Sequence, residues 1–282
     1  MNLLRYVATS AATARILGLL SLGGVAGFHH LLRQLLARSF RASYTGALGG
    51  WAWVYARPAL MACAYYFVFD KILAVRMEAA VTGTPSYPLF LLAGLLPWMV
   101  FMEGVMEGVQ SLVREAELLK KARFPLELMP ARAILLAALR LSPLLLLLWP
   151  LGIWLGEGQA VGLLYLLPWL LLQLLLTYYL ALTLAILTAA VRDVGMLVES
   201  VLPLMMFFTP VLYTRQSVPE GFGWLLAINP FTPLADGYHR ILLAGSPPGG
   251  GVFLALLFWL LLFGVFSHVL LRRAREQLVD WL

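Results

Sequence analysis

Apolar residues fall in long blocks along this chain, and short clusters of charged residues separate the blocks. A helix needs roughly 20 apolar residues, at about 1.5 Å each, to cross a hydrocarbon core of about 30 Å. Six segments predict membrane-spanning helices: residues 51–69, 88–112, 133–155, 161–190, 196–213 and 252–271. The fifth is the weakest, because it is short and contains Glu199, Pro203 and Pro210.

The N-terminal region holds two further apolar patterns. Residues 16–27 form a run of only about a dozen residues that is rich in glycine, so we expect a segment too short to cross rather than a seventh span or a signal-peptide core. Residues 28–41 are amphipathic at helical spacing, which is typical of a basic helix in the cytoplasmic membrane interface. The apolar half holds Phe28, Leu31, Leu32, Leu35, Leu36 and Phe40, and the polar half holds Arg33, Gln34, Arg38 and Arg41.

Two connections between the predicted spans have patterns of their own. Residues 112–128 combine charges and leucines at helical spacing, which predicts a cytoplasmic helix with one apolar face. The helix is expected to end at Phe124-Pro125, because proline lacks a backbone donor. Residues 214–251 are too apolar for a solvated loop. They predict two short re-entrant helices in the outer leaflet, broken at Asn229-Pro230 and Thr232-Pro233, a form that is stable only inside protein or beside a water-filled cavity.

Composition and charge fix the class of protein. The chain has 282 residues, 62% apolar and 12% charged, against roughly 45–50% and about 25% in soluble domains, which excludes a soluble enzyme. The net charge of +6 is better explained by basic cytoplasmic loops than by nucleic-acid binding. Basic residues gather in the N-terminal stretch, the loop after the second span and the tail, so both termini are predicted to be cytoplasmic. The predicted fold class is an all-α integral membrane protein.

Sequence motifs for catalysis and for nucleotide binding are missing. The chain has no G-x-x-x-x-G-K-[ST], H-E-x-x-H or G-x-S-x-G motif, its histidines are scattered, and Cys63 is its single cysteine. We therefore expect no metal, no catalytic residue and no cofactor in this chain. Energy for active transport would come from another subunit or from an ion gradient.

Two acidic residues lie within the second predicted span. Glu103 and Glu107 are four residues apart and share one helix face. They form either the proton relay of a gradient-driven transporter or, as we favour, ion pairs with basic residues of neighbouring elements. Arg140 in the third span is the best candidate partner.

Aromatic side chains cluster within the predicted spans. Most are expected to serve helix packing or the interfacial belts. A more specific hypothesis is a translocation path on whose aromatic faces sugar rings stack. The candidate lining residues are Tyr65, Tyr66, Phe69, Trp98, Tyr178, Tyr179, Phe207 and Phe208.

Four stretches of the chain carry a family resemblance. They are YPLFLLAGLLPW (87–98), LLKKARFPLELMP (118–130), RDVGMLVESVLPLMMFFTPVLY (192–213) and VPEGFGWLLAINPFTPLADGYHRILLAG (218–245). In order and spacing they resemble the permease subunit of type-2 ABC exporters, in the polysaccharide and O-antigen export branch. The V-P-E…W-x-x-x-x-N-P-x-T element is the most specific part, and the resemblance covers roughly residues 30–275.

The resemblance implies partners and substrate. It implies a homodimer bound to two copies of a separate cytoplasmic ATPase, which would hold the ATP and magnesium. The substrate would be a lipid-linked glycan that crosses the inner membrane of a bacterium.

The resemblance also assigns regions of the chain. Residues 1–50 would form an N-terminal extension and interface helix, 51–271 the transmembrane domain and 272–282 a cytoplasmic tail. The coupling helix would lie at about 112–127 and contact the ATPase through Glu117, Leu118, Leu119, Lys120, Lys121, Arg123 and Phe124. The outer gate would lie at about 214–250 and include Trp224, Asn229, Pro230, Pro233 and Asp236. The extension before Phe28 is longer than the usual pattern and has no assigned role.

Three alternatives remain open from the sequence. A type-2 exporter of drugs or lipids would share every feature except the glycan. An integral-membrane transferase would need a polar catalytic group, for which Asp236, His239 and Arg240 are the candidates. A proton-coupled transporter would work without an ATPase.

Overall fold

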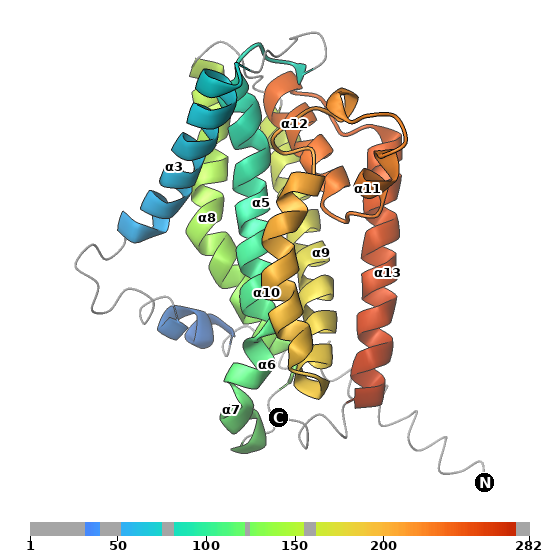
Figure 1. The fold of residues 1–282 in the computed structure, drawn as a ribbon. Coiled ribbons are helices and arrows are strands. Elements are labelled where there is room, and N and C mark those ends of the chain that lie inside the picture. The colour runs from blue at the N-terminus through green and yellow to red at the C-terminus, as the bar shows by residue number, and fades with distance from the viewer. Residues whose placement is uncertain (1–31, 40–51, 75–81, 122–124, 155–161, 275–282) are drawn as a thin grey trace. The chain divides into compact units, whose positions relative to one another are not determined.

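Every regular element that the structure describes is a helix (Figure 1). The computed structural model describes residues 32–39, 52–74, 82–121, 125–154 and 162–274. The chain forms two compact units, residues 1–48 and residues 49–282. In the first unit, residues 32–39 are helical, with Leu32, Leu35 and Leu36 half-buried and Arg33 and Arg38 exposed, which is the predicted amphipathic pattern. Phe28, Leu31, Phe40 and Arg41 lie outside the described residues.

Four helices of the second unit are long and apolar enough to cross a membrane. They are α5 (Tyr87–Val109), α8 (Leu128–Trp154), α9 (Gly162–Ala190) and α13 (Gly250–Ala274). They coincide with the second, third, fourth and sixth predicted spans and lie alongside one another in Figure 1.

The first and fifth predicted spans are shorter helices. The first is α3 (Ala52–Tyr66), which continues into a π-helical turn, η1 (Phe67–Ile72). The fifth is α10 (Asp193–Met205), which ends in a 3-10 turn, η2 (Met206–Phe208). Thr209 then adopts an extended backbone, because the residue before a proline is disfavoured in the helical region and Pro210 follows it.

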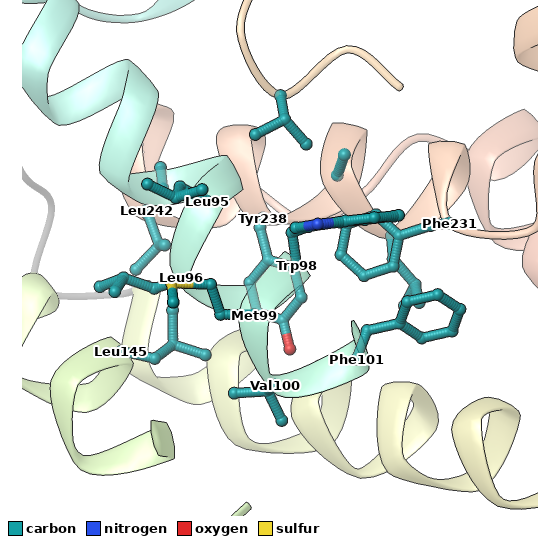
Figure 2. Close-up of a cluster of buried hydrophobic side chains, with 14 of the residues drawn as sticks. Leu95, Leu96, Trp98, Met99, Val100, Phe101, Leu145, Phe231, Tyr238 and Leu242 are labelled. Carbon is teal, nitrogen blue, oxygen red and sulfur yellow. The ribbon is translucent and has the colours of Figure 1, made fainter. Parts of the chain in front are cut away.

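Helix α5 lies at the centre of this unit. It packs against α3, α8, α9, α10 and α12 (Thr232–Ala244), and most of its side chains are buried. A helix that is apolar on all sides is stable in such a position. Figure 2 shows part of the resulting cluster, in which the Trp98 ring lies 5.0 Å from the Phe231 ring, centroid to centroid, and Phe231 lies 4.9 Å from Phe101.

Two glycines allow α5 and α9 to approach closely. A Cβ atom on Gly104 would lie 3.0 Å from Thr177 Cγ2, and one on Gly108 would lie 2.7 Å from Ala181 Cβ. Small residues at helix contacts let backbones come together in membrane proteins. The α5 to α9 spacing therefore depends on the absence of a side chain at these two positions.

Polar contacts add specificity to this packing. Gln173 of α9 is fully buried, and its Nε2 donates to the Pro97 carbonyl oxygen of α5 at 2.9 Å. Trp169 Nε1 donates to the Leu234 carbonyl oxygen of α12 at 3.2 Å. A Cβ on Gly237 would lie 2.3 Å from the Trp169 ring, so the indole rests directly on the α12 backbone. Helix α12 is thereby fixed against α9.

We predict that Gly108→Ala lowers the thermal stability of the protein. The new methyl group would overlap Ala181 Cβ, which cannot move without its helix. Overpacking of this kind costs about 1–3 kcal/mol. Thermal unfolding of the detergent-purified protein measures the effect, and Ala181→Gly added to Gly108→Ala should restore Tm.

Gly250→Ala is the matched control, because a Cβ there meets nothing within 4 Å. An unchanged Tm for Gly108→Ala, or no recovery in the double variant, would contradict the close-packing explanation.

Candidate functional site

The predicted coupling segment consists of two short helices at the C-terminal end of α5, the end that the basic residues predict to face the cytoplasm (the inner end). They are α6 (Ser111–Arg114) and α7 (Ala116–Lys121), separated at Glu115, whose φ of −103° and ψ of 19° interrupt the helix. The prediction of a single helix from about residue 112 to Phe124-Pro125 is therefore wrong at Glu115, where the described part divides into two helices. Arg123 and Phe124 lie outside the described residues.

Side chains of this segment separate into a buried and an exposed set. Leu112 and Leu119 are buried within this chain, whereas Glu117 and Lys120 are exposed. The side chains of Leu118 and Lys121 lie outside the described set. Among the described coupling residues, the surface open to a partner is charged rather than apolar.

Among the described residues, two ion pairs connect this segment to the long helices, and a third joins two of the long helices to each other. Arg132 of α8 pairs with Glu115 at 2.8 Å, and Arg114 of α6 pairs with Glu107 of α5 at 2.6 Å. Arg140 of α8 pairs with Glu103 of α5 at 2.8 Å, which confirms the prediction that Arg140 is a partner of the acidic residues in the second span.

The Glu107 pair agrees with the favoured interpretation, an ion pair with a basic residue of a neighbouring element, although Arg114 was not named as the partner. The Glu115 to Arg132 pair was not predicted from the sequence. Glu107 and Arg114 are seven residues apart, a spacing of about two helical turns that places both on one side. Glu115 and Arg132 meet because α7 and the following turn lead the chain back to the start of α8, which no local pattern reveals. At the inner end, α10 is attached by Gln110 Nε2, which donates to Glu199 Oε1 at 2.9 Å.

The predicted outer gate contains the expected pair of short helices, α11 (Gly223–Ala227) and α12. Asn229 lies in the break between them and is almost fully buried. Its Oδ1 accepts from the Phe231 backbone N–H at 2.9 Å, and its Nδ2 donates to Thr209 Oγ1 at 2.6 Å and to the Phe208 carbonyl oxygen at 3.2 Å. The sequence indicated Asn229 as a helix break but not this role in holding the end of α10.

The other gate candidates differ in exposure. Pro230 and Pro233 are buried, and Trp224 is 58% exposed. The Asp236 carboxylate pairs with Arg215 Nε at 3.0 Å, which links α12 to η3 (Arg215–Ser217).

A cavity of about 630 Å³ opens beside this ion pair. Its walls come from the residues before and within α5, the segment after α10, α12 and the residues that follow α12. The lining residues are Thr82, Gly83, Phe90, Pro210, Tyr213, Thr214, Arg215, Gln216, Asp236, His239, Arg240, Ala244, Ser246 and Val252.

His239 serves as a packing residue in this wall. Its ring stacks on Phe90 at 4.1 Å between centroids, and its Nε2 lies 3.1 Å from the Phe90 carbonyl oxygen, which can only accept a hydrogen bond. Although Asp236, His239 and Arg240 line one cavity, this fixed imidazole does not favour the transferase alternative. Among the described residues, no group of three or more His, Cys, Asp or Glu could hold a metal ion.

The candidate lining aromatics lie in different places. Tyr65, Tyr66 and Phe69 are half-buried on α3 and η1, and Phe207 and Phe208 are about half exposed after α10. Tyr178 and Tyr179 are half-buried on α9, where the Tyr179 ring lies within 3.6 Å of a Cβ built on Gly264 of α13. Trp98 is 1% exposed and belongs to the core, so it offers no surface to a path in this structure.

Together these features define a polytopic helical membrane protein with paired charges at the inner end of a central helix and a polar cavity near α12. Comparison with known proteins agrees with this class. The ABC-2 type transporter family matches residues 30–243, and the chain belongs to that family. It is therefore a transporter membrane subunit.

Curated relatives carry a more specific name. An O-antigen export system permease protein RfbA from Myxococcus xanthus is 28% identical over 231 residues, which cover 81% of this chain and 86% of the relative. Another protein of that name from Klebsiella pneumoniae is 25% identical over 216 residues, covering 76% of this chain and 81% of the relative. A second Klebsiella pneumoniae relative is 24% identical over 217 residues, with 77% and 81% covered.

We predict that Asn229→Asp destabilises the protein although it preserves side-chain shape. The substituted oxygen could still accept from Phe231 N, but a second oxygen would face the Phe208 carbonyl in place of a donor. A buried group that loses its partner costs about 1–3 kcal/mol. Thermal unfolding should show a lower Tm.

Gln216→Glu makes the same chemical change at an exposed position and is the control. Equal Tm values for the two variants would contradict a structural role for the Asn229 amide.

Proposed function

We propose that this chain is the permease subunit of an ATP-driven exporter that moves a lipid-linked polysaccharide, such as O-antigen, across the bacterial inner membrane. It would act as a homodimer with two copies of a separate cytoplasmic ATPase, which holds ATP and magnesium. The observation that carries the proposal is the family match together with three relatives of one name, each aligned over more than three quarters of this chain.

The proposed topology has six spans with both termini in the cytoplasm. Helix α3 with η1 covers residues 52–72, which is long enough to cross at about 1.5 Å per residue. Helix α10 with the segment after it would complete the fifth span. Helices α11 and α12 would be re-entrant, which the burial of α12 against α5 and α9 supports, since irregular backbone in a membrane must be surrounded by protein or water.

The proposed coupling route begins at the exposed charges of α7. Glu117 and Lys120 would contact the ATPase, and closure of the ATPase pair would displace α7. The Glu115 to Arg132 ion pair would transfer that displacement to α8, and the Glu107 to Arg114 pair would transfer it to α5. Both long helices would then move together, because the Glu103 to Arg140 pair also joins them.

The proposed path is lined by the aromatic residues that remain accessible. Phe207 and Phe208 have the largest exposed surface among the candidates, and Tyr65, Tyr66 and Phe69 add hydroxyl groups and rings on α3 and η1. Both α3 and α10 pack on α5, so the two groups flank one central helix. Tyr178 and Tyr179 remain candidates from α9, whereas the buried Trp98 is not included.

An exporter of drugs or lipids is the alternative, because it would belong to the same family and would have the same coupling segment. The two functions differ in the transported molecule. Expression of this permease with its ATPase in a bacterium that makes a polysaccharide but lacks its own exporter should restore polysaccharide at the cell surface.

Surface staining with an antibody to the polysaccharide measures this outcome, and cells that receive the ATPase alone are the control. Resistance to a drug, or outward lipid movement, without surface polysaccharide would contradict the proposed substrate.

We predict that Lys120→Glu reduces both export and the permease-stimulated ATPase activity by at least about tenfold. The variant reverses an exposed charge on α7, and like charges across a protein interface cost several kcal/mol. Because the Lys120 side chain is exposed, the permease should keep its Tm.

Lys71→Glu is the control for ATPase stimulation, since Lys71 lies on η1 rather than on the coupling segment. Its effect on export is not compared, because Lys71 pairs with Asp70 and lies over the ring of Tyr66, a proposed path residue. Unchanged ATPase stimulation by Lys120→Glu would show that α7 does not contact the ATPase.

A further inference from the structure

The cavity beside α12 has the size and shape of a ligand site. Its volume of about 630 Å³ lies within the roughly 300–1,000 Å³ typical of small-molecule sites. One wall depends on Gly83, whose φ of +82° is unfavourable for other residues. A Cβ on Gly83 would lie 3.3 Å from the Ala244 backbone nitrogen, so the chain before α5 passes close to the end of α12. The cavity is therefore enclosed by segments that are distant in sequence.

The cavity wall offers both donors and acceptors. Asp236 provides a carboxylate, and Arg215 and Arg240 provide guanidinium groups. Ser246 Oγ is buried and has no hydrogen-bond partner among the described residues, although it lines the cavity. A buried hydroxyl without a partner is costly, so a ligand that bonded to it would remove an existing penalty.

This mixture of groups favours a sugar over a phosphate. Phosphate sites combine cations with backbone donors, whereas the Asp236 carboxylate would repel an anion and already occupies Arg215. Sugar hydroxyls donate and accept, so they match a wall that holds an acceptor at Asp236 and donors at Arg215 and Ser246. Pro210, Tyr213 and Val252 give apolar surface for the C–H face of a ring.

We propose that the cavity in each protomer is a binding subsite for sugar residues of the exported chain. This inference rests on the proposed function and names where the polymer is held near the outer end. A sugar bound there would keep the chain from sliding back while the ATPases reset. The cavity would thus give direction to stepwise export.

Photo-crosslinking in cells that export the polysaccharide tests the subsite. The crosslinker p-benzoylphenylalanine is placed at one of three exposed positions: Gln216 at the cavity, Phe208 on the proposed path, or Phe258 on the outer face of α13 as the control. After irradiation the permease is purified under denaturing conditions and stained for glycan. We expect adducts at Gln216 and Phe208, and none at Phe258 or in cells that make no polysaccharide.

A second variant separates binding in the cavity from mere proximity. Ser246→Val removes the unpartnered hydroxyl and narrows the cavity, and its backbone N–H can still donate to the Arg240 carbonyl oxygen. The adduct at Gln216 should fall about fivefold, the equivalent of one hydrogen bond, while the adduct at Phe208 persists.

The outcomes distinguish the two proposals. An adduct at Phe208 without one at Gln216, or a Gln216 adduct that Ser246→Val does not reduce, overturns the subsite and leaves the exporter in place. Absence of export and of both adducts contradicts the proposed function, and the subsite with it.

Discussion

Burial of α5 is the constraint that organises the transmembrane unit. Helices α3, α8, α9, α10 and α12 pack around it, and its glycines set how closely α9 can approach. Between helices in a membrane, close packing and internal hydrogen bonds replace the hydrophobic driving force of water. The hydrogen bond from Gln173 to the Pro97 carbonyl oxygen therefore stabilises the contact between α9 and α5, because a buried amide in a membrane has no water to bond to instead.

The charged groups that α5 brings into the unit are confined to its inner half. Glu103 and Glu107 each pair with an arginine, one on α8 and one on α6. The Arg140 to Glu103 pair is mostly buried, and loss of one member would leave a charge in a poorly solvated place. These pairs therefore hold the order of α5, α6 and α8 at the inner end of the unit.

Sequence periodicity predicted the long helices because their apolar runs match the thickness of a membrane. It also predicted the paired short helices at α11 and α12, since Asn229-Pro230 and Pro233 interrupt the pattern. The break at Glu115 and the burial of Trp98 were not predictable in this way. Each depends on contacts between segments far apart in the chain, and periodicity gives the spacing along a helix but not its neighbours.

The two ends of the unit are held by different kinds of contact, and the difference fits the proposed transport cycle. At the inner end, Arg114 and Glu107 are both about half exposed, and exposed ion pairs contribute only about 0–1 kcal/mol. At the gate, Asn229 makes buried bonds with neutral partners, which salt does not screen. A displacement of α7 by the ATPase would therefore rearrange the Arg114 to Glu107 pair before it broke the hydrogen bonds of Asn229. The displacement would reach α12 through α5 and α9, which move as one rigid body and pack against α12.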